Sequence, residues 1–123
     1  MFNNRLRTML LLGFGVFISA PAFANGAIAI DHAKGNRWGV AYDQPNMASA
    51  ENRALSECGR GCKVVLRFPQ GCGAYSIDRT TGSTVYVWAG DNNRAAAERR
   101  ALSGCRNRGG TQCMIRAWGC NSR

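Results

Sequence analysis

Short runs of alternating apolar and polar residues recur along the chain, separated by turn-forming stretches. Residues 27–30 and 38–42 are two such runs, and the loop 31–36, which contains Gly35, lies between them. Alternation on both sides of a short loop predicts a β-hairpin. Residues 75–77 and 85–88 repeat the pattern around a second loop, so the sequence predicts two hairpins.

An alanine-rich segment follows each predicted hairpin. Asn46 and Asn93 are suitable N-caps for helices over 47–58 and 94–105. In each helix, small residues recur every four positions and form one face that allows close approach of a sheet. These residues are Ala50, Ala54 and Cys58, and Ala97, Ala101 and Cys105. Third strands are predicted over 63–68 and 114–118, so each unit is strand, strand, helix, strand.

The two units are copies of one sequence. Aligned without a gap at an offset of 47, residues 26–58 and 73–105 are identical at 15 of 33 positions. A unit this small cannot bury a sufficient core alone. The sequence therefore predicts one α+β domain, residues 25–123, built from pseudo-symmetric repeats 26–72 and 73–120, with about six strands and two helices.

Residues 1–24 have the features of a cleaved signal peptide. Arg5 and Arg7 precede the apolar run 9–20, and residues 21–24 form a small-x-small cleavage site. The run is too short to span a membrane. We expect a periplasmic or secreted protein without a membrane span.

Six cysteines follow the cleavage site, an even number that predicts disulfides in an oxidising compartment. Zinc is a weaker alternative, because the spacings lack the usual Cys-x2-Cys knuckle. The repeat favours pairs within each unit, Cys58 with Cys62 and Cys105 with Cys113. Cys72 and Cys120 then pair with each other, near the axis that relates the two halves.

The net charge is +9, or +7 without residues 1–24, and 12 of the 14 remaining basic residues are arginine. Arginine is suited to bidentate contacts with carboxylates and phosphates. No basic run is long enough to resemble a nucleic-acid-binding arm. The charge therefore has two interpretations, a compositional bias or a surface for a nucleic acid or another anionic polymer.

Functional residues are expected where the two copies differ. If Val85 and Val87 face the core, then Tyr86 and Trp88 face the other way, where the first copy has glycine and alanine. The third strands add Arg116 and Trp118 to that face. Aromatic residues with arginine are typical anchors of protein interfaces. Tyr86, Trp88, Arg116 and Trp118 are the predicted partner site, with core packing as the alternative.

Catalytic chemistry is poorly represented. His32, the single histidine, lies in the first hairpin loop, and its counterpart is Arg79. A two-carboxylate site would need Glu51 and Glu98 in one cleft, whereas an ion pair with Arg94 explains Glu98 more simply. We expect no enzyme activity, no cofactor and no metal.

Several motifs resemble a family of small exported bacterial domains of unknown function. They are the segments 27–30 and 35–42, the helix motif 50–58 that ends in cysteine, and Gly-Cys-Gly-Ala-Tyr at 71–75. Members of that family include secreted mycobacterial proteins and a neisserial type IV pilus factor. The resemblance implies an exported, non-catalytic role and defines no catalytic residues.

Three functions follow as hypotheses. The first is a periplasmic interaction protein that binds an envelope partner and supports type IV pilus assembly and stability. The second is a secreted effector or inhibitor that binds a host or rival protein. The third is a module that binds polyanions.

Overall fold

The computed structural model describes residues 23–122 and contains the six strands and two helices that the sequence predicts. The expected signal peptide lies outside the described residues except for Phe23 and Ala24. Helix α3 runs two residues beyond the predicted end. The elements are β1 (Asn25–Asp31), β2 (Trp38–Gln44), α2 (Met47–Cys58), β3 (Cys62–Phe68), β4 (Cys72–Asp78), β5 (Tyr86–Asp91), α3 (Arg94–Asn107) and β6 (Cys113–Cys120).

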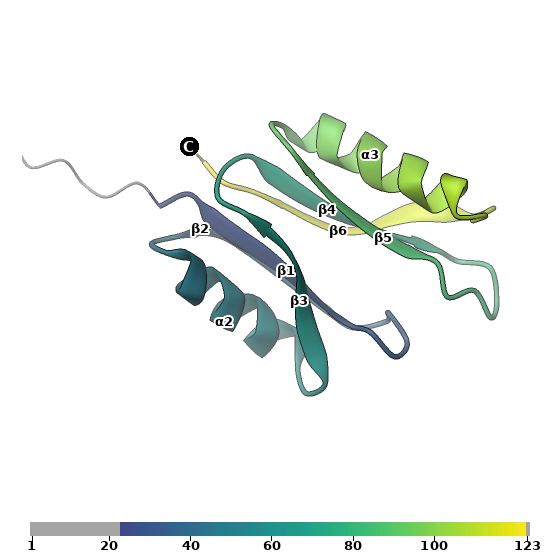
Figure 1. Ribbon diagram of the computed structural model, residues 1–123, viewed down its shortest axis with the longest axis horizontal. Coiled ribbons are helices and arrows are strands. Elements are labelled where there is room, and N and C mark those ends of the chain that lie inside the picture. Colours follow the sequence, from purple (N-terminus) through teal and green to yellow (C-terminus); the bar gives the residue numbers. More distant parts are fainter. Residues whose placement is uncertain (1–22, 123) are drawn as a thin grey trace, which may run out of the picture.

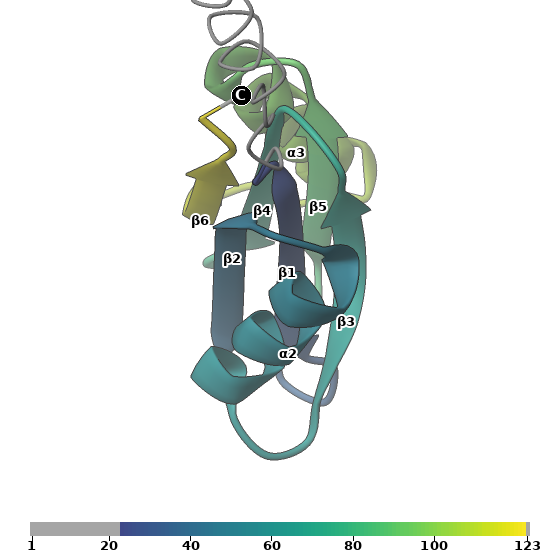
Figure 2. The same ribbon diagram turned by 90° about the vertical axis from the view of Figure 1, so that its left-hand side faces the viewer.

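The strands form two antiparallel three-stranded sheets that pack face to face. Their strand orders are β2-β1-β3 and β5-β4-β6. Helix α2 covers the outer face of the first sheet and α3 the outer face of the second, which gives four layers (Figure 1). Strand β2 lies beside β6 along one side of the sandwich, and β3 lies beside β5 along the other (Figure 2).

Each helix begins and packs as its sequence predicts. The Asn46 side chain accepts a hydrogen bond from the N–H of Ser49, and Asn93 accepts one from Ala96. The six small residues of the two predicted faces are buried against the sheets. Gly39 of β2 lies under α2, where a Cβ would come within 2.0 Å of the Ala54 carbonyl oxygen. Small residues therefore set the close approach of helix and sheet.

Large side chains fill the space between the two sheets. Ile28 and Ile30 of β1 pack there against Phe68, Tyr75 and Ile77. Because the opposite faces of β1 and β4 lie under helices, both central strands are buried on both faces. The Tyr75 hydroxyl donates a 2.7 Å hydrogen bond to the Gly35 carbonyl in the other half, and burial raises the pKa of Tyr75. The hydroxyl thus stays protonated as a donor in a buried place.

An aspartate at the end of each central strand holds the following loop. Asp31 accepts from the N–H of Ala33 and pairs with Arg37, and Asp78 accepts from the N–H groups of Thr80 and Gln112. Burial opposes ionisation of both carboxyls, but these donors outweigh it and lower both pKa values, that of Asp78 to about 2. Both aspartates have the structural role that their loop positions indicate.

All six cysteines are in disulfides: Cys58–Cys62, Cys105–Cys113 and Cys72–Cys120. These are the pairs that the repeat favours, but one location differs from expectation. Cys72 begins β4 and pairs in register with Cys120 of β6, so this disulfide lies within the second sheet and does not join the two halves. Three disulfides are typical of chains that fold in an oxidising compartment.

Removing the long-range disulfide should cost more stability than removing a short-range one. The Cys72–Cys120 bond spans 48 residues and the Cys58–Cys62 bond spans 4. Loop-closure entropy then predicts losses of about 4 and about 2 kcal/mol in the free energy of unfolding. Urea denaturation of the Cys72→Ala/Cys120→Ala and Cys58→Ala/Cys62→Ala variants measures both losses. The reverse ranking would contradict this account.

Stability should fall as the pH drops from about 4 to about 2. The Asp78 carboxyl has a pKa of about 2 in the folded chain, below its ordinary value of 3.8, so the folded state favours the ionised form. That contribution is present above pH 4 and is lost as the pH passes through the folded value. Thermal melting of Asp78→Asn should show a smaller acid-dependent loss than wild type. Asp91→Asn is the control that leaves the Asp78 carboxylate in place.

Candidate functional site

The two long sides of the sandwich differ in how they are closed. On the β3–β5 side, the Phe68 ring and the Leu66 side chain lie over glycines of β4 and β5. A Cβ on Gly73 would come within 2.8 Å of the Phe68 ring, and one on Gly90 would contact Leu66 at 3.8 Å. Large side chains thus fill this side.

The β2–β6 side is built differently because Gly119 occupies the place that Phe68 has in the first sheet. Phe68 pairs with Gly26 at one edge of β1, and Gly119 pairs with Gly73 at the same edge of β4. Without a side chain at 119, Val40 and Tyr42 of β2 lie directly over β6, at 2.6 and 3.0 Å from a Cβ built there. This difference between the halves leaves an open groove.

The β2–β6 groove has a volume of about 360 Å³. It combines aromatic, aliphatic and charged side chains from both sheets and from α2. Its lining residues are Trp38, Gly39, Val40, Tyr42, Glu57, Arg116, Ala117 and Trp118. Tyr42 is 49% exposed and Trp118 is 42% exposed, so two large apolar side chains at the groove are available to a partner.

Arg116 is the cation of the groove. It occupies a bulge in β6, because the register with β4 steps from the Tyr75–Ala117 pair to the Ser76–Ile115 pair. Its guanidinium carbon lies 5.2 Å from the centroid of the Trp38 ring, a cation–π contact. The Nε atom is buried and makes no hydrogen bond within residues 23–122. A buried donor without an acceptor is unfavourable. The Arg116 side chain also lines the groove, where a partner can approach the guanidinium.

Trp118 is held in place from the opposite side. The Arg94 guanidinium of α3 lies over its ring, 3.6 Å from the centroid, and Arg94 also forms the expected pair with Glu98 at 2.8 Å. A long side chain stacked on one ring face fixes the position of the indole while part of it stays exposed. Trp118 therefore presents a preformed apolar surface.

Two of the four predicted site residues are elsewhere. Tyr86 and Trp88 are half-buried and pack against the core between the sheets, which is the alternative that the sequence left open. Val87 lies under α3, where a Cβ on Gly104 would contact it at 2.7 Å. The gapless alignment had assigned the two faces of this strand the wrong way round. Ile30 pairs with Trp38 across the first hairpin, whereas Ile77 pairs with Tyr86 across the second, which is one residue longer. A one-residue slip reverses the faces of a strand.

The structure thus brings Arg116 and Trp118 together and adds Trp38 and Tyr42, which the sequence analysis missed. Trp38 is half-buried, and it packs against the core between the sheets as well as lining the groove. The sequence signal for these two site residues was their position, with Trp38 next to the hairpin loop and Tyr42 near the N-terminus of the helix. Their faces could not be assigned without the register.

The two glutamates considered as a catalytic pair do not share a cleft. Glu51 of α2 pairs with Arg67 at 2.6 Å, and Glu98 of α3 pairs with Arg94. The two helices lie on opposite outer faces of the sandwich (Figure 1). His32 is exposed in its hairpin loop, with its ring edge toward Trp88 at a centroid distance of 6.0 Å. Within residues 23–122, no group of three metal-ligating side chains occurs.

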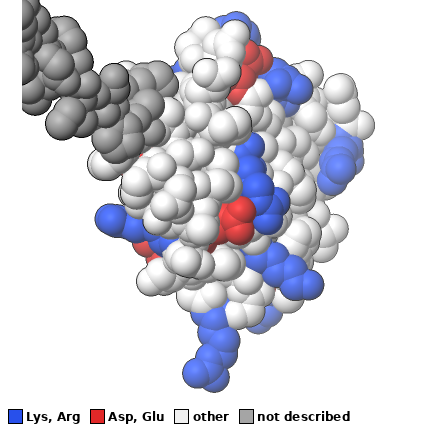
Figure 3. Space-filling model, turned by 60° about the vertical axis from the view of Figure 1, so that its left-hand side comes forward, with Lys and Arg blue, Asp and Glu red and all other residues white. Residues whose placement is uncertain are grey.

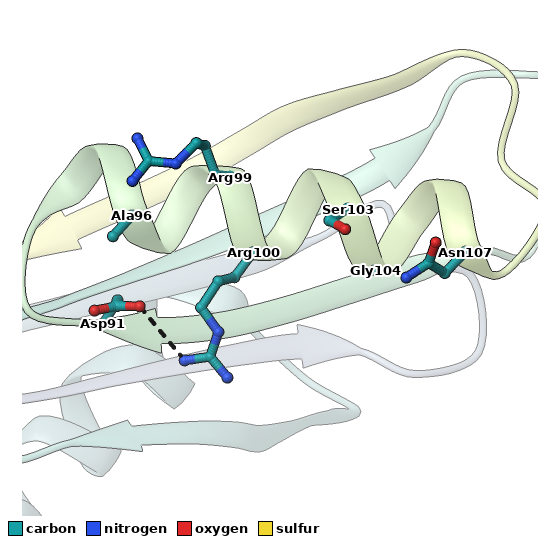
Figure 4. Close-up of a pocket in the computed structure, with 7 residues that line it drawn as sticks. All are labelled: Asp91, Ala96, Arg99, Arg100, Ser103, Gly104 and Asn107. Carbon is teal, nitrogen blue, oxygen red and sulfur yellow. Dashed lines mark ion pairs between the residues drawn. The ribbon is translucent and has the colours of Figure 1, made fainter.

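A second, shallow depression lies along α3 and β5, with a volume of about 460 Å³. Figure 4 shows Arg100 directed toward Asp91, with which it pairs at 3.7 Å, while the Arg99 side chain extends away from Arg100. Ser103 and Asn107 continue its polar lining along the helix. It presents no aromatic side chain, and we regard the β2–β6 groove as the candidate site.

In the part of the chain that the structure describes, no helix is long and apolar enough to cross a membrane.

Comparisons with known proteins give a family and a fold. No curated protein matches the chain. Among solved structures, it is similar to the NMR structure of Rv1813c from Mycobacterium tuberculosis, with 30% identity and a TM-score of 0.59 over 85% of this chain and 81% of that one. A domain of unknown function, DUF4189, matches residues 25–120, and the chain belongs to this family.

Proposed function

We propose that this protein is an exported, non-catalytic interaction protein that binds an envelope protein through the β2–β6 groove. The observation that carries the proposal is the Arg116 guanidinium, which contacts the Trp38 ring in a groove that two exposed aromatic side chains also line. Its buried Nε has no acceptor within residues 23–122. Aromatic residues and arginine dominate the binding energy of protein interfaces. The groove therefore has the composition of an interface centre.

The groove favours a segment that presents one carboxylate and one apolar side chain. The carboxylate would accept from Arg116, and a charge-assisted bond of this kind is about twice as strong as a neutral one. The apolar side chain would pack between Tyr42 and Trp118. Glu57 at the rim already pairs with Arg53 at 3.2 Å, so it does not compete for Arg116.

A non-catalytic role is supported by how the reactive side chains are used. The six cysteines are in disulfides, and five carboxylates form ion pairs, each with a different arginine. Asp78 binds backbone N–H groups. Figure 3 shows acidic side chains next to basic ones on one face of the molecule. These groups stabilise the fold and leave a scaffold with binding surfaces.

The partner that we propose is a type IV pilus component. The support is the likeness in size and layout to the neisserial pilus factor TfpC, together with the apparent export signal over residues 1–24. The same order of elements and strands in the two halves also supports an origin by duplication, with pseudo-symmetric repeats. Divergence at Gly119 and Arg116 would then have specialised one side for binding.

Deleting the gene should reduce the number or stability of surface pili, and wild-type protein should restore them. Complementation with Tyr42→Ala/Trp118→Ala should fail, because each truncated anchor costs about 2 kcal/mol, or about 30-fold in affinity. Electron microscopy of pili is the measurement. Asn52→Ala is the control, since Asn52 is exposed on α2 and lies outside the groove.

A photo-crosslinking residue at position 118, compared with one at position 52, tests the contact itself. Crosslinks to a pilus component from position 118 alone would support the proposal. Normal pili in the deletion strain would remove the pilus assignment. Full complementation by the groove variant would remove the groove as the binding surface.

A further inference from the structure

The positive charge of the domain is concentrated at one end. Four connections and the residues that flank them meet there, which we call the loop end: residues 31–37, 59–63, 78–85 and 106–112. The two hairpins and the α3–β6 loop lie at the right of Figure 1, and the α2–β3 turn lies at the lower tip. Both chain ends of the described region lie at the opposite end, because β1 begins there and β6 ends there.

Hydrogen bonds tie these connections to one another. The Arg37 guanidinium donates to the Arg60 carbonyl at 2.6 Å, which joins the first hairpin to the α2–β3 turn. The Arg79 N–H donates to the Gln112 carbonyl at 3.0 Å, which joins the second hairpin to the α3–β6 loop. The Tyr75–Gly35 bond joins the two halves. The loop end is therefore one fixed surface.

The loop end carries a net formal charge of +5 from seven basic and two acidic residues. The rest of residues 23–122 has six basic and five acidic residues, a net of +1. Apart from Arg37, the basic side chains of the loop end are exposed and form no ion pair within the described residues. They are Lys34, Arg60, Lys63, Arg79, Arg106 and Arg108.

The two acids of the loop end cannot neutralise this surface. Asp31 and Asp78 are buried, and their carboxylates are taken by backbone N–H groups and, for Asp31, by Arg37. Both helices also end here, and a basic residue stabilises the C-terminus of a helix. That accounts for Arg106 in the last turn of α3. It does not account for Lys34 and Arg79, which lie in hairpin loops.

We propose that the loop end binds a linear phosphate polymer through its backbone phosphates. The six free cations come from four separate connections, and the cavity of about 80 Å³ at this end includes only Lys34 among them. A small anion could reach few of them, whereas a chain of phosphates can cross the whole surface. Electrostatic contact of this kind does not depend on sequence.

The charge complementarity favours a polymer in solution over a membrane surface. Peripheral membrane binding usually adds apolar side chains that enter the bilayer. The exposed large apolar residues of the described chain are Phe23, Tyr42 and Trp118. Phe23 precedes β1, Tyr42 is near the end of β2, and Trp118 is near the end of β6, all away from the loop end.

Fluorescence anisotropy with a labelled duplex DNA of arbitrary sequence tests the proposal on the oxidised protein. Contact with four or five phosphates predicts a slope of about −4 for log affinity against log salt. Arg60→Gln/Lys63→Gln should reduce that slope by about 2 and weaken binding about tenfold or more at low salt. Arg106→Gln/Arg108→Gln should act in the same way, which guards against a folding defect in one variant.

Arg99→Gln/Arg100→Gln is the matched control, because it removes the same charge from the outer face of α3. Inorganic polyphosphate should compete with the DNA. Equal weakening by the control variant, or affinity that is insensitive to salt, would overturn the proposal. So would binding to phosphatidylglycerol vesicles without binding to DNA. The loop-end variants should leave crosslinking from position 118 unchanged, so failure here is distinct from failure of the groove.

Discussion

Burial of the two central strands on both faces is the constraint on which this structure depends. β1 and β4 each have a helix on one face and the other sheet on the opposite face. The helix side needs small residues, and the intersheet side needs large ones. Glycine provides the closest helix contact in both halves, at Gly39 on the strand and at Gly104 on the helix. A chain of this size can form a core only by joining both halves across the sheets.

The groove results from one difference between the two sheets, a phenylalanine in β3 where β6 has a glycine. Phe68 fills the β3–β5 side, where its ring lies over the glycines of β1 and β4. Gly119 has no side chain, so side chains of β2 lie over β6 on the opposite side. The bulge at Arg116 then turns a cation toward Trp38. Packing of the core and formation of the site therefore depend on the same positions. Changes in the core of this side would also change its surface.

Charge and apolar surface are separated in the molecule. Among residues 23–122, ion pairs hold Asp31, Glu51, Glu57, Asp91 and Glu98, and most of the excess of arginine and lysine lies where the loops meet. The exposed aromatic residues of the groove lie along the β2–β6 side. A protein partner and a phosphate polymer would therefore occupy different surfaces of one rigid domain. The fold holds both in place by disulfides and by hydrogen bonds that join the loops.

The sequence alone determined the features that depend on neighbours along the chain. Helix N-caps, the small faces of α2 and α3 and the three cysteine pairs follow from short-range patterns and from the repeat. Tertiary structure decided which side chains meet across the sheets. The second hairpin is one residue longer, which placed Tyr86 and Trp88 in the core, and only the facing of β2 and β6 brought Trp38 and Tyr42 to Arg116. Successive side chains of a strand lie on opposite faces, so the loop length and the packing of the sheets decide which side chains face the core.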